Sequence, residues 1–409
     1  MFAGPPSDLW DCILMFALMD RLTVARRANV PPFHVMDMLE RAAQRQRTYA
    51  DLISLTSGQP STGAPQAVNA EAVRLLQSGD PLGYTPATGI LELRQAIAGH
   101  HRAWHGIEVS PEDVIVTTGA SGGFLASFLA AFDVGDKVAM ARPSYPCYRN
   151  VLAALGCEVV EIPTGAAERF QPTVEQVREL HERVGLKGLV VASPANPTGT
   201  MLRPEELAAL ARYCEEAGIQ LISDEIYHGL TYGGDGGRGR SAWETSRDAV
   251  VFGSFSKYFS MTGWRIGWLL APAHLRRAID VLVGNFTICP PALAQHAAVA
   301  AFTPDAYAEL DGHVTRYTTN RGVLLDGLRS LGVTEMAPAD GAFYVYADVS
   351  RWTDDTMAWC HQVLDRTGVA MAPGIDFDPV DGHRFVRLSF AGSAAEIEQG
   401  LDRLSTVLR

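Results

Sequence analysis

The stretch "VVFGSFSKYFSMTGWRIGW" (residues 250–268) begins as an apolar, β-branched run and continues into two serines, a lysine and several aromatic residues. Lys257 is one of only three lysines among the 34 basic residues of the chain. Arginine stays protonated, whereas lysine can lose its proton and act as a nucleophile. The stretch therefore predicts a strand that leads directly into a reactive lysine.

The same kind of β-branched run recurs through the middle of the chain. The runs span residues 113–119, 137–143, 157–163, 188–194, 219–225, 249–255 and 265–271, and helical patterns such as 204–218 lie between them. This alternation predicts a mostly parallel sheet with helices on both faces. The last third differs, with strand patterns at 341–350 and 383–392 and helical patterns at 353–368 and 393–408. We therefore predict an α/β fold with a large domain and a smaller α+β domain.

We divide the chain into four segments on this basis. They are an N-terminal extension (1–18), a segment that packs with the small domain (19–60), a large cofactor-binding domain (61–300) and a small domain (301–409). The apolar stretch 9–19 has no preceding basic residue, so it is a poor signal peptide. It is interpreted either as a helix laid on the body or as a segment upstream of a natural start at Met19.

Composition limits the possible partners. The chain is 47% hydrophobic and 20% charged, which is typical of a globular protein with a substantial core. A net charge of −12 argues against nucleic-acid binding, which depends on basic patches. The six cysteines form no CxxC motif, and no run of about 18 apolar residues is present. We expect a cytoplasmic protein that has no metal site and no contact with nucleic acid or membrane.

Polar residues follow the predicted strands at the points where the strands end. Ligands of open α/β sheets bind outside the carboxyl ends of the strands. The first strand ends in "TGASGG" (118–123), whose small residues leave backbone N–H groups open to a phosphate. The later strands end near Tyr145, Asn196, Asp224, Tyr227 and Lys257. Together these groups suit a ligand with a phosphate, a flat ring, a basic ring nitrogen, a phenolic oxygen and an aldehyde, which is pyridoxal 5′-phosphate.

The chain resembles the class I/II aminotransferases of fold type I, in the group similar to aspartate aminotransferase. The resemblance covers about residues 28–409. The matching motifs are "GYTPATGILELRQAIA" (83–98), "VTTGAS" (116–121), "RPSYPCY" (142–148), "NPTG" (196–199), "SDEIY" (223–227), "SFSKYFSMTGWRIGW" (254–268) and "RFVRLSFAG" (384–392). Their order and spacing match the family throughout, so the resemblance implies a pyridoxal-phosphate-dependent transaminase.

The resemblance also implies roles for individual residues at the cofactor ring. Lys257 is expected to form the Schiff base with the cofactor aldehyde and to move a proton at the substrate α-carbon. Asp224 is expected to pair with the ring nitrogen and keep it protonated. Asn196 and Tyr227 are expected to hydrogen-bond the phenolic oxygen, and Tyr145 is expected to stack on the ring.

Further roles concern the phosphate and the substrate. The residues that the resemblance assigns to the phosphate are Ala120, Ser121, Ser254, Ser256 and Arg265. Tyr84 matches a tyrosine that reaches the phosphate of the neighbouring subunit, which implies a homodimer with shared active sites. Arg387 is expected to bind the substrate α-carboxylate, with Asn196 beside it, and Gly58 to line the substrate entrance.

Two departures from the family pattern concern the amino donor. The entrance segment reads "GQPSTGAP" (58–65), without the acidic and aromatic residues common in the family. Ser121 stands where some aspartate-using relatives carry a lysine. We therefore expect an aliphatic donor such as alanine or valine to serve at least as well as aspartate, with a 2-oxo acid as acceptor.

Two other functions suit the same cofactor. One is a pyridoxal-phosphate lyase that eliminates at Cβ or Cγ, including cleavage of a C–S bond. The other is an effector domain that binds the cofactor without turnover. Such domains are fused to an N-terminal winged helix, and the roughly 30 residues before the body show no basic helix-turn-helix pattern.

Overall fold

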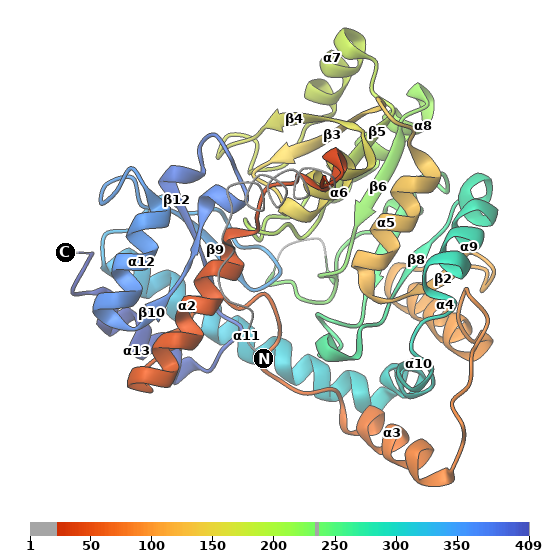
Figure 1. Ribbon diagram of the computed structural model, residues 1–409, viewed down its shortest axis with the longest axis horizontal. Helices are drawn as coiled ribbons and strands as arrows, with labels where there is room; N and C mark the ends of the chain where they lie inside the picture. The colour runs from red at the N-terminus through yellow and green to blue at the C-terminus, as the bar shows by residue number, and fades with distance from the viewer. Residues whose placement is uncertain (1–22, 234–236, 409) are drawn as a thin grey trace, which may run out of the picture.

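The computed structural model describes residues 23–233 and 237–408, so the predicted extension 1–18 and the apolar stretch 9–19 lie outside the described residues. A large part built on a seven-stranded sheet lies beside a smaller part that carries the C-terminus (Figure 1). Each of the seven predicted runs contains one strand. These are β2 (Val114–Thr117), β3 (Lys137–Arg142), β4 (Glu158–Pro163), β5 (Gly188–Ala192), β6 (Gln220–Asp224), β7 (Val250–Ser254) and β8 (Gly267–Leu270).

The large sheet has the strand order β2-β8-β7-β6-β5-β3-β4. The pairs from β7 to β4 are parallel, whereas β8 runs antiparallel to both of its neighbours. The central strands are almost entirely buried. Strands that are apolar on both faces need a layer of helices on each side. The prediction of a mostly parallel sheet between helices is therefore confirmed.

Helices cover both faces of this sheet. One face packs against α5 (Gly119–Ala131), α6 (Pro146–Leu155) and α9 (Ala273–Thr287). The other face is covered by α4 (Leu91–His105), α7 (Val174–Val184) and α8 (Pro204–Ala217), whereas α10 (Ala292–Ala298) packs against α4, and α3 (Gln66–Ser78) packs against α10. In α8, Pro204 at the first turn and Gly218 with a φ of 68° just past the end explain why the boundaries were predictable.

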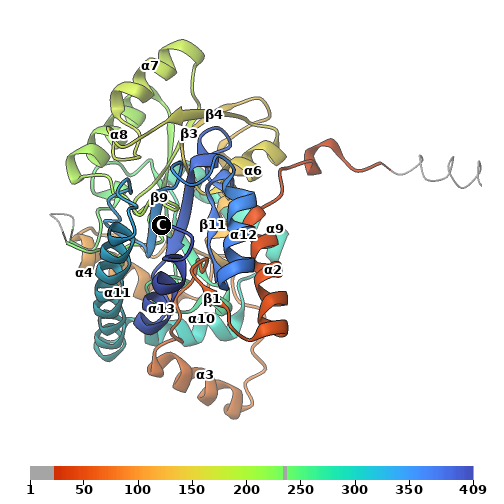
Figure 2. The same cartoon turned by 90° about the vertical axis from the view of Figure 1, so that its left-hand side faces the viewer.

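The smaller part has its own antiparallel sheet, β11-β12-β9. Its elements are α11 (Pro304–Ser330), β9 (Tyr344–Asp348), α12 (Thr356–Thr367), β10 (Val369–Ala370), β11 (Ala372–Pro373), β12 (Phe385–Ser389) and α13 (Ala394–Leu404). The predicted strands and helices of this part are confirmed, each with ends a few residues shorter. α11 continues along the side of both parts (Figures 1 and 2).

The N-terminal segment joins the smaller part, although it lies at the opposite end of the sequence. α2 (His34–Tyr49) lies alongside α12 (Figure 2), and β1 (Ile53–Ser54) pairs in parallel with β10. The boundaries of the four predicted segments stay a prediction. No helix in the described part of the chain combines the length and apolar character that crossing a bilayer requires.

Candidate active site

A cavity of about 590 Å³ opens at the carboxyl ends of the parallel strands, with walls from both parts of the molecule. The predicted site residues that line it are Gly58, Ala120, Ser121, Tyr145, Asn196, Asp224, Tyr227, Ser254, Ser256, Lys257, Arg265 and Arg387. Tyr84 is the exception, since its side chain is 84% exposed and stands outside this cavity. The structure therefore brings together every predicted site residue except the one assigned to a neighbouring subunit.

Lys257 follows the end of β7 and projects into the cavity. Its Nζ donates a hydrogen bond to the carbonyl oxygen of Gly58 at 2.6 Å. Burial, with the positive charges of Arg387 and Arg265, lowers the pKa of Lys257 to about 8, while Asp224 acts in the opposite direction. Part of this amine is therefore unprotonated near neutral pH, as a nucleophile requires.

Asp224 is the last residue of β6 and is buried. Its Oδ1 accepts a hydrogen bond from the Ile226 backbone N–H at 3.1 Å, and its Oδ2 accepts one from the Tyr148 hydroxyl. Burial raises the pKa of Asp224 to about 6, against the effect of these hydrogen bonds and of Lys257. A buried carboxyl group of this kind favours a cationic partner, such as a protonated ring nitrogen.

Two tyrosines of the site were missed in the sequence. Tyr148 lies three residues after Tyr145, and that spacing places both on one side of α6, with their ring centroids 5.5 Å apart. The hydroxyl of Tyr344 lies 2.8 Å from that of Tyr227, and its ring centroid lies 4.4 Å from the guanidinium carbon of Arg387. The helical spacing was a usable signal for Tyr148, whereas nothing local distinguished Tyr344 from a core residue.

Arg387 lies in the middle of β12 and is buried. Its Nη1 donates to Asn196 Oδ1 and its Nη2 to the Thr56 carbonyl oxygen, both at 2.8 Å. Among the described residues, Arg387 forms no ion pair with a carboxylate and its Nε has no hydrogen-bond partner. A buried guanidinium in this state suits an incoming carboxylate.

The N-terminus of α5 forms an anion-binding corner of the cavity. Gly119 has a φ of 70°, and a Cβ added there would lie 2.6 Å from Arg265 Nη2. Glycine thus lets the guanidinium approach the helix end, where backbone N–H groups lack intrahelical acceptors. Arg265 Nη1 donates to Ser256 Oγ at 3.5 Å, and the Ser256 N–H donates to Ser254 Oγ at 3.0 Å. This corner suits a phosphate.

The remaining wall of the cavity is apolar and comes from the start of α2. Phe33, Val35, Met36 and Leu39 line the cavity from this helix. The ring of Phe33 meets that of Tyr145 edge-on, with centroids 6.0 Å apart. The helix belongs to the segment 19–60, which was predicted to pack with the small domain but was not predicted to line the site. The cavity is therefore polar at the strand ends and hydrophobic where it meets the start of α2.

The start of α2 is held by a residue that is distant in sequence. The helix has no side-chain cap of its own. Instead, the carboxylate of Asp376 accepts hydrogen bonds from the N–H groups of His34 and Val35 at 2.7 and 2.6 Å. A carboxylate in this position satisfies free helix N–H groups and interacts favourably with the helix dipole. The apolar wall is thus fixed to the smaller part.

Known proteins agree with this geometry. The chain matches the family of aminotransferases of class I and II over residues 50–404. The valine–pyruvate aminotransferase of Mycobacterium tuberculosis is 59% identical over 385 residues, which cover 94% of this chain and 98% of that protein. The aspartate/prephenate aminotransferase of Thermus thermophilus is 37% identical over 90% of this chain and 94% of its own length.

Solved structures give the same result. A crystal structure of an aminotransferase from Mycobacterium tuberculosis matches with a TM-score of 0.92 and 59% identity, over 95% of this chain and 99% of that one. The aspartate aminotransferase of Thermus thermophilus with maleate matches with a TM-score of 0.88 and 34% identity, over 94% of this chain and 100% of that one. These relatives favour amino transfer over the lyase and effector alternatives. The chain belongs to the class I and II aminotransferase family and transfers an amino group from an amino acid to a 2-oxo acid.

Proposed function

We propose that the cavity around Lys257 holds pyridoxal 5′-phosphate, and that the donor is an aliphatic amino acid such as valine or alanine, with a small 2-oxo acid such as pyruvate as acceptor. The side chains that line the cavity support this cofactor. A lysine of lowered pKa, a buried carboxyl group and a cationic helix end occupy one cavity. Once bound, the cofactor supplies an aldehyde that reacts with amino groups and a ring that takes up carbanion charge.

Each residue around the proposed cofactor has its own role in the transfer. Arg387 binds the α-carboxylate of the donor and fixes its orientation. The amine of Lys257 removes and returns the proton at the α-carbon, which arginine could not do. Tyr227 and Asn196 donate hydrogen bonds to the phenolic oxygen, and Tyr344 positions the Tyr227 hydroxyl at 2.8 Å.

The apolar wall at the start of α2 is the main reason for proposing an aliphatic amino donor. The cations among the described lining residues are Lys257, Arg265 and Arg387, and each already has a role. The second carboxylate of aspartate would face an apolar wall without a cationic partner, which disfavours aspartate relative to an aliphatic donor. An aliphatic side chain gains roughly 0.8 kcal/mol for each methylene that it buries. The valine–pyruvate relative, with its 59% identity, is in line with this preference.

Steady-state kinetics test the donor preference. We expect kcat/KM for valine or alanine to equal or exceed kcat/KM for aspartate, with pyruvate and 2-oxoglutarate as acceptors. Ser121→Lys adds a cation to the cavity and should raise the value for aspartate relative to valine by about tenfold. Arg277→Lys, in an exposed pair with Asp280, keeps a charge outside the lining residues and serves as the control. A hundredfold preference of the wild type for aspartate over both aliphatic donors would contradict the proposal.

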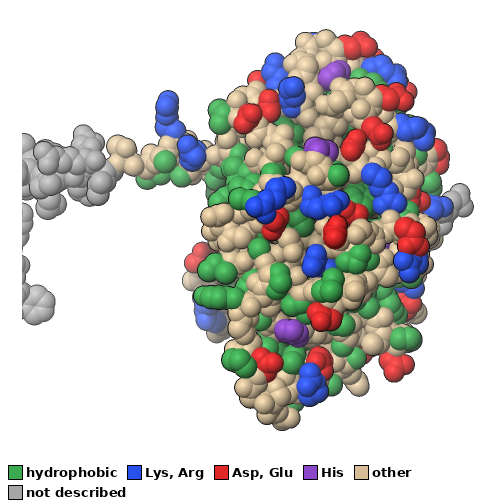
Figure 3. Space-filling view, turned by 90° about the vertical axis from the view of Figure 1, so that its right-hand side faces the viewer, with side chains coloured by type: hydrophobic (Ala, Val, Ile, Leu, Met, Phe, Trp, Pro, Cys, Tyr) green, Lys and Arg blue, Asp and Glu red, His purple; other side chains and the backbone are tan. Residues whose placement is uncertain are grey.

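We also propose a two-fold homodimer in which each subunit completes the other's site. Tyr84 is 84% exposed, Leu76 on α3 is 62% exposed and Phe286 on α9 is 52% exposed. Hydrophobic side chains reach the surface at several places on the face shown in Figure 3. Tyr84 does not line the cavity of its own chain, so its hydroxyl would meet a phosphate only in a partner's site, and two-fold dimers are the commonest closed assembly.

The variant Tyr84→Phe distinguishes a role of Tyr84 in dimer formation from a role in cofactor binding. We expect the dimer to persist, because the aromatic ring remains, and the affinity for the cofactor to fall by about tenfold through loss of one hydrogen bond to a phosphate. Light scattering gives the mass, and a cofactor titration of the cofactor-free protein gives the affinity. A wild-type monomer with full activity at nanomolar concentration would show that the sites are not shared.

A further inference from the structure

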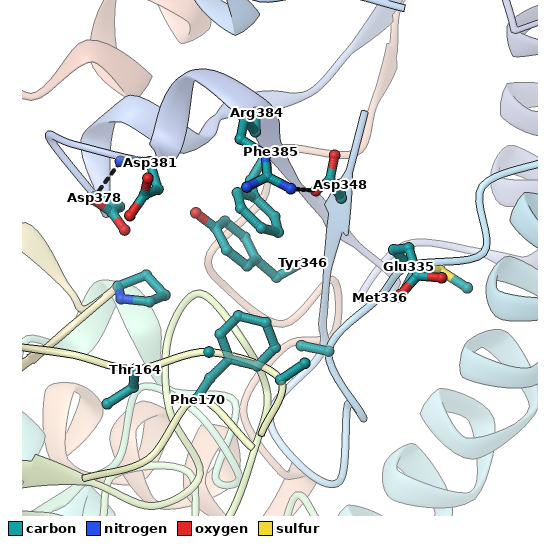
Figure 4. A pocket seen from close by; sticks show the side chains of 14 residues that line it. Thr164, Phe170, Glu335, Met336, Tyr346, Asp348, Asp378, Asp381, Arg384 and Phe385 are labelled. Carbon is teal, nitrogen blue, oxygen red and sulfur yellow. Dashed lines mark hydrogen bonds and ion pairs between the residues drawn. The ribbon is translucent and has the colours of Figure 1, made fainter. Parts of the chain in front are cut away.

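A second cavity, of about 320 Å³, lies between the two parts of the molecule (Figure 4). The large part contributes Pro143 and the segment 164–170 after β4, and the small part contributes residues from β9, β12 and the loop before β12. It shares no lining residue with the active-site cavity among the described residues. Its volume is at the lower end of the range for small-ligand pockets, about 300–1,000 Å³.

Three aromatic rings form one side of this second cavity. Tyr346 and Phe385 stack with an interplanar angle of 7° and centroids 4.7 Å apart. Phe170 meets both rings edge-on, at 6.2 and 6.4 Å. Aromatic rings of this kind offer an apolar surface to the body of a ligand, and their faces attract cations.

The hydroxyl of Tyr346 is buried without a hydrogen bond to any described residue. Tyr346 is 1% exposed, and among the described residues its Oη has no hydrogen-bond partner. Figure 4 shows this oxygen pointing into the cavity, toward Asp378 and Asp381. A buried polar group without a partner is costly, and such groups in folded proteins are rare. The hydroxyl can therefore accept a hydrogen bond from a ligand and direct its own hydrogen toward a carboxylate.

The charge around the cavity is negative. Arg384 pairs with Asp348 at 2.6 Å, and Arg142 lies 3.5 Å from Asp378 and 3.4 Å from Asp381. The carboxylates that line the cavity outnumber these guanidinium groups: they are Glu335, Asp348, Asp378 and Asp381. A ligand that enters here meets an excess of negative charge, which favours a cation and disfavours the anionic substrates of the enzyme.

We propose that this second cavity is a binding site for a small organic cation, namely a guanidinium or ammonium group on a flat apolar body. The cationic N–H groups donate to Tyr346 Oη and to the carboxylate of Asp381, and the apolar body packs against Phe170. A guanidinium suits the site best, because its planar set of donors can serve a hydroxyl and a carboxylate together.

The site is separate from the substrate pocket. The ring of Phe377 stands between them, with its centroid 4.9 Å from the guanidinium carbon of Arg387 and 6.4 Å from the centroid of Tyr346. A ligand of the second cavity therefore does not compete with an α-carboxylate at Arg387. Binding should be the same within twofold with and without saturating pyruvate, and competition would place the ligand in the active site and overturn the proposal.

Benzylguanidine and its neutral isostere benzylurea test the charge requirement on the holoenzyme. By isothermal titration calorimetry, we expect benzylguanidine to bind one site per chain with a Kd of about 1 mM or tighter. Benzylurea should bind at least about tenfold more weakly, because it lacks the charge. Equal binding of the two compounds, or no binding of benzylguanidine at ten times that concentration, would overturn the proposal.

Substitutions of residues that line the second cavity test whether benzylguanidine binds there. Tyr346→Phe should weaken benzylguanidine by about tenfold, since it removes a hydrogen bond to a charged group. The fold should survive, because this hydroxyl has no partner among the described residues. Asp381→Asn should also weaken the probe severalfold. Asp326→Asn, in an exposed pair with Arg329, is the control and should bind as the wild type does. Wild-type affinity in both cavity variants would overturn the assignment.

Discussion

Lys257→Ala is expected to lower kcat for amino transfer by about four orders of magnitude or more, because it removes the amine that we propose as both nucleophile and proton carrier of the site. The side chain donates its one hydrogen bond to a backbone carbonyl, that of Gly58, and forms no ion pair among the described residues. The fold should therefore survive. The measurements are kcat for valine with pyruvate, the far-ultraviolet circular dichroism spectrum and the thermal midpoint.

Lys257→Arg is the matched control for charge. It keeps a cation near Asp224 but cannot lose its proton at neutral pH, so it should be as inactive as Lys257→Ala. In the proposed site, groups other than Lys257 at the N-terminus of α5 would hold the phosphate, so both variants should retain binding of the cofactor, measured by phosphate analysis after gel filtration. A kcat within tenfold of the wild type in either variant would rule out Lys257 as the reacting amine.

Most of the fold was predictable because each signal was local. The seven β-branched runs became the seven strands of the large sheet, and Pro204 and Gly218 mark the ends of one helix in the sequence itself. The antiparallel direction of β8 was not predictable, because both faces of that strand are buried, as they are in the parallel strands of the same sheet. The pairing of Ile53 with Val369 was equally hidden, since two-residue strands so far apart carry no local pattern.

The candidate site was predictable to the extent that it follows the strand ends. Asp224 and Lys257 lie at or just past the carboxyl ends of adjacent parallel strands, so the geometry of the sheet brings them together. The apolar wall at Phe33 and Met36 was missed, because it depends on a contact between α2 and Asp376, more than 300 residues away in sequence. Long-range contacts of this kind leave no trace in a single sequence.

Asp224→Asn is expected to have opposite effects on stability and on activity. Burial raises the pKa of Asp224 to about 6 in the folded protein, from an ordinary value of 3.8. Between these values the unfolded chain releases the proton and the folded chain keeps it, so stability falls as the pH rises from about 4 to about 6. At about 1.4 kcal/mol for each pKa unit, the ionised carboxylate costs the cofactor-free protein roughly 3 kcal/mol at pH 7.

Asparagine removes that cost, because its Oδ1 can keep accepting from the Ile226 N–H while its Nδ2 donates to the Tyr148 hydroxyl oxygen. The cofactor-free variant should therefore unfold at higher urea concentration than the wild type at pH 7, and the two should converge near pH 4. Its kcat should fall by about three orders of magnitude, because a neutral amide cannot keep a ring nitrogen protonated. Lower stability of the variant at pH 7 would show that Asp224 is not a buried, uncompensated charge, and wild-type kcat would show that it does not face the ring nitrogen.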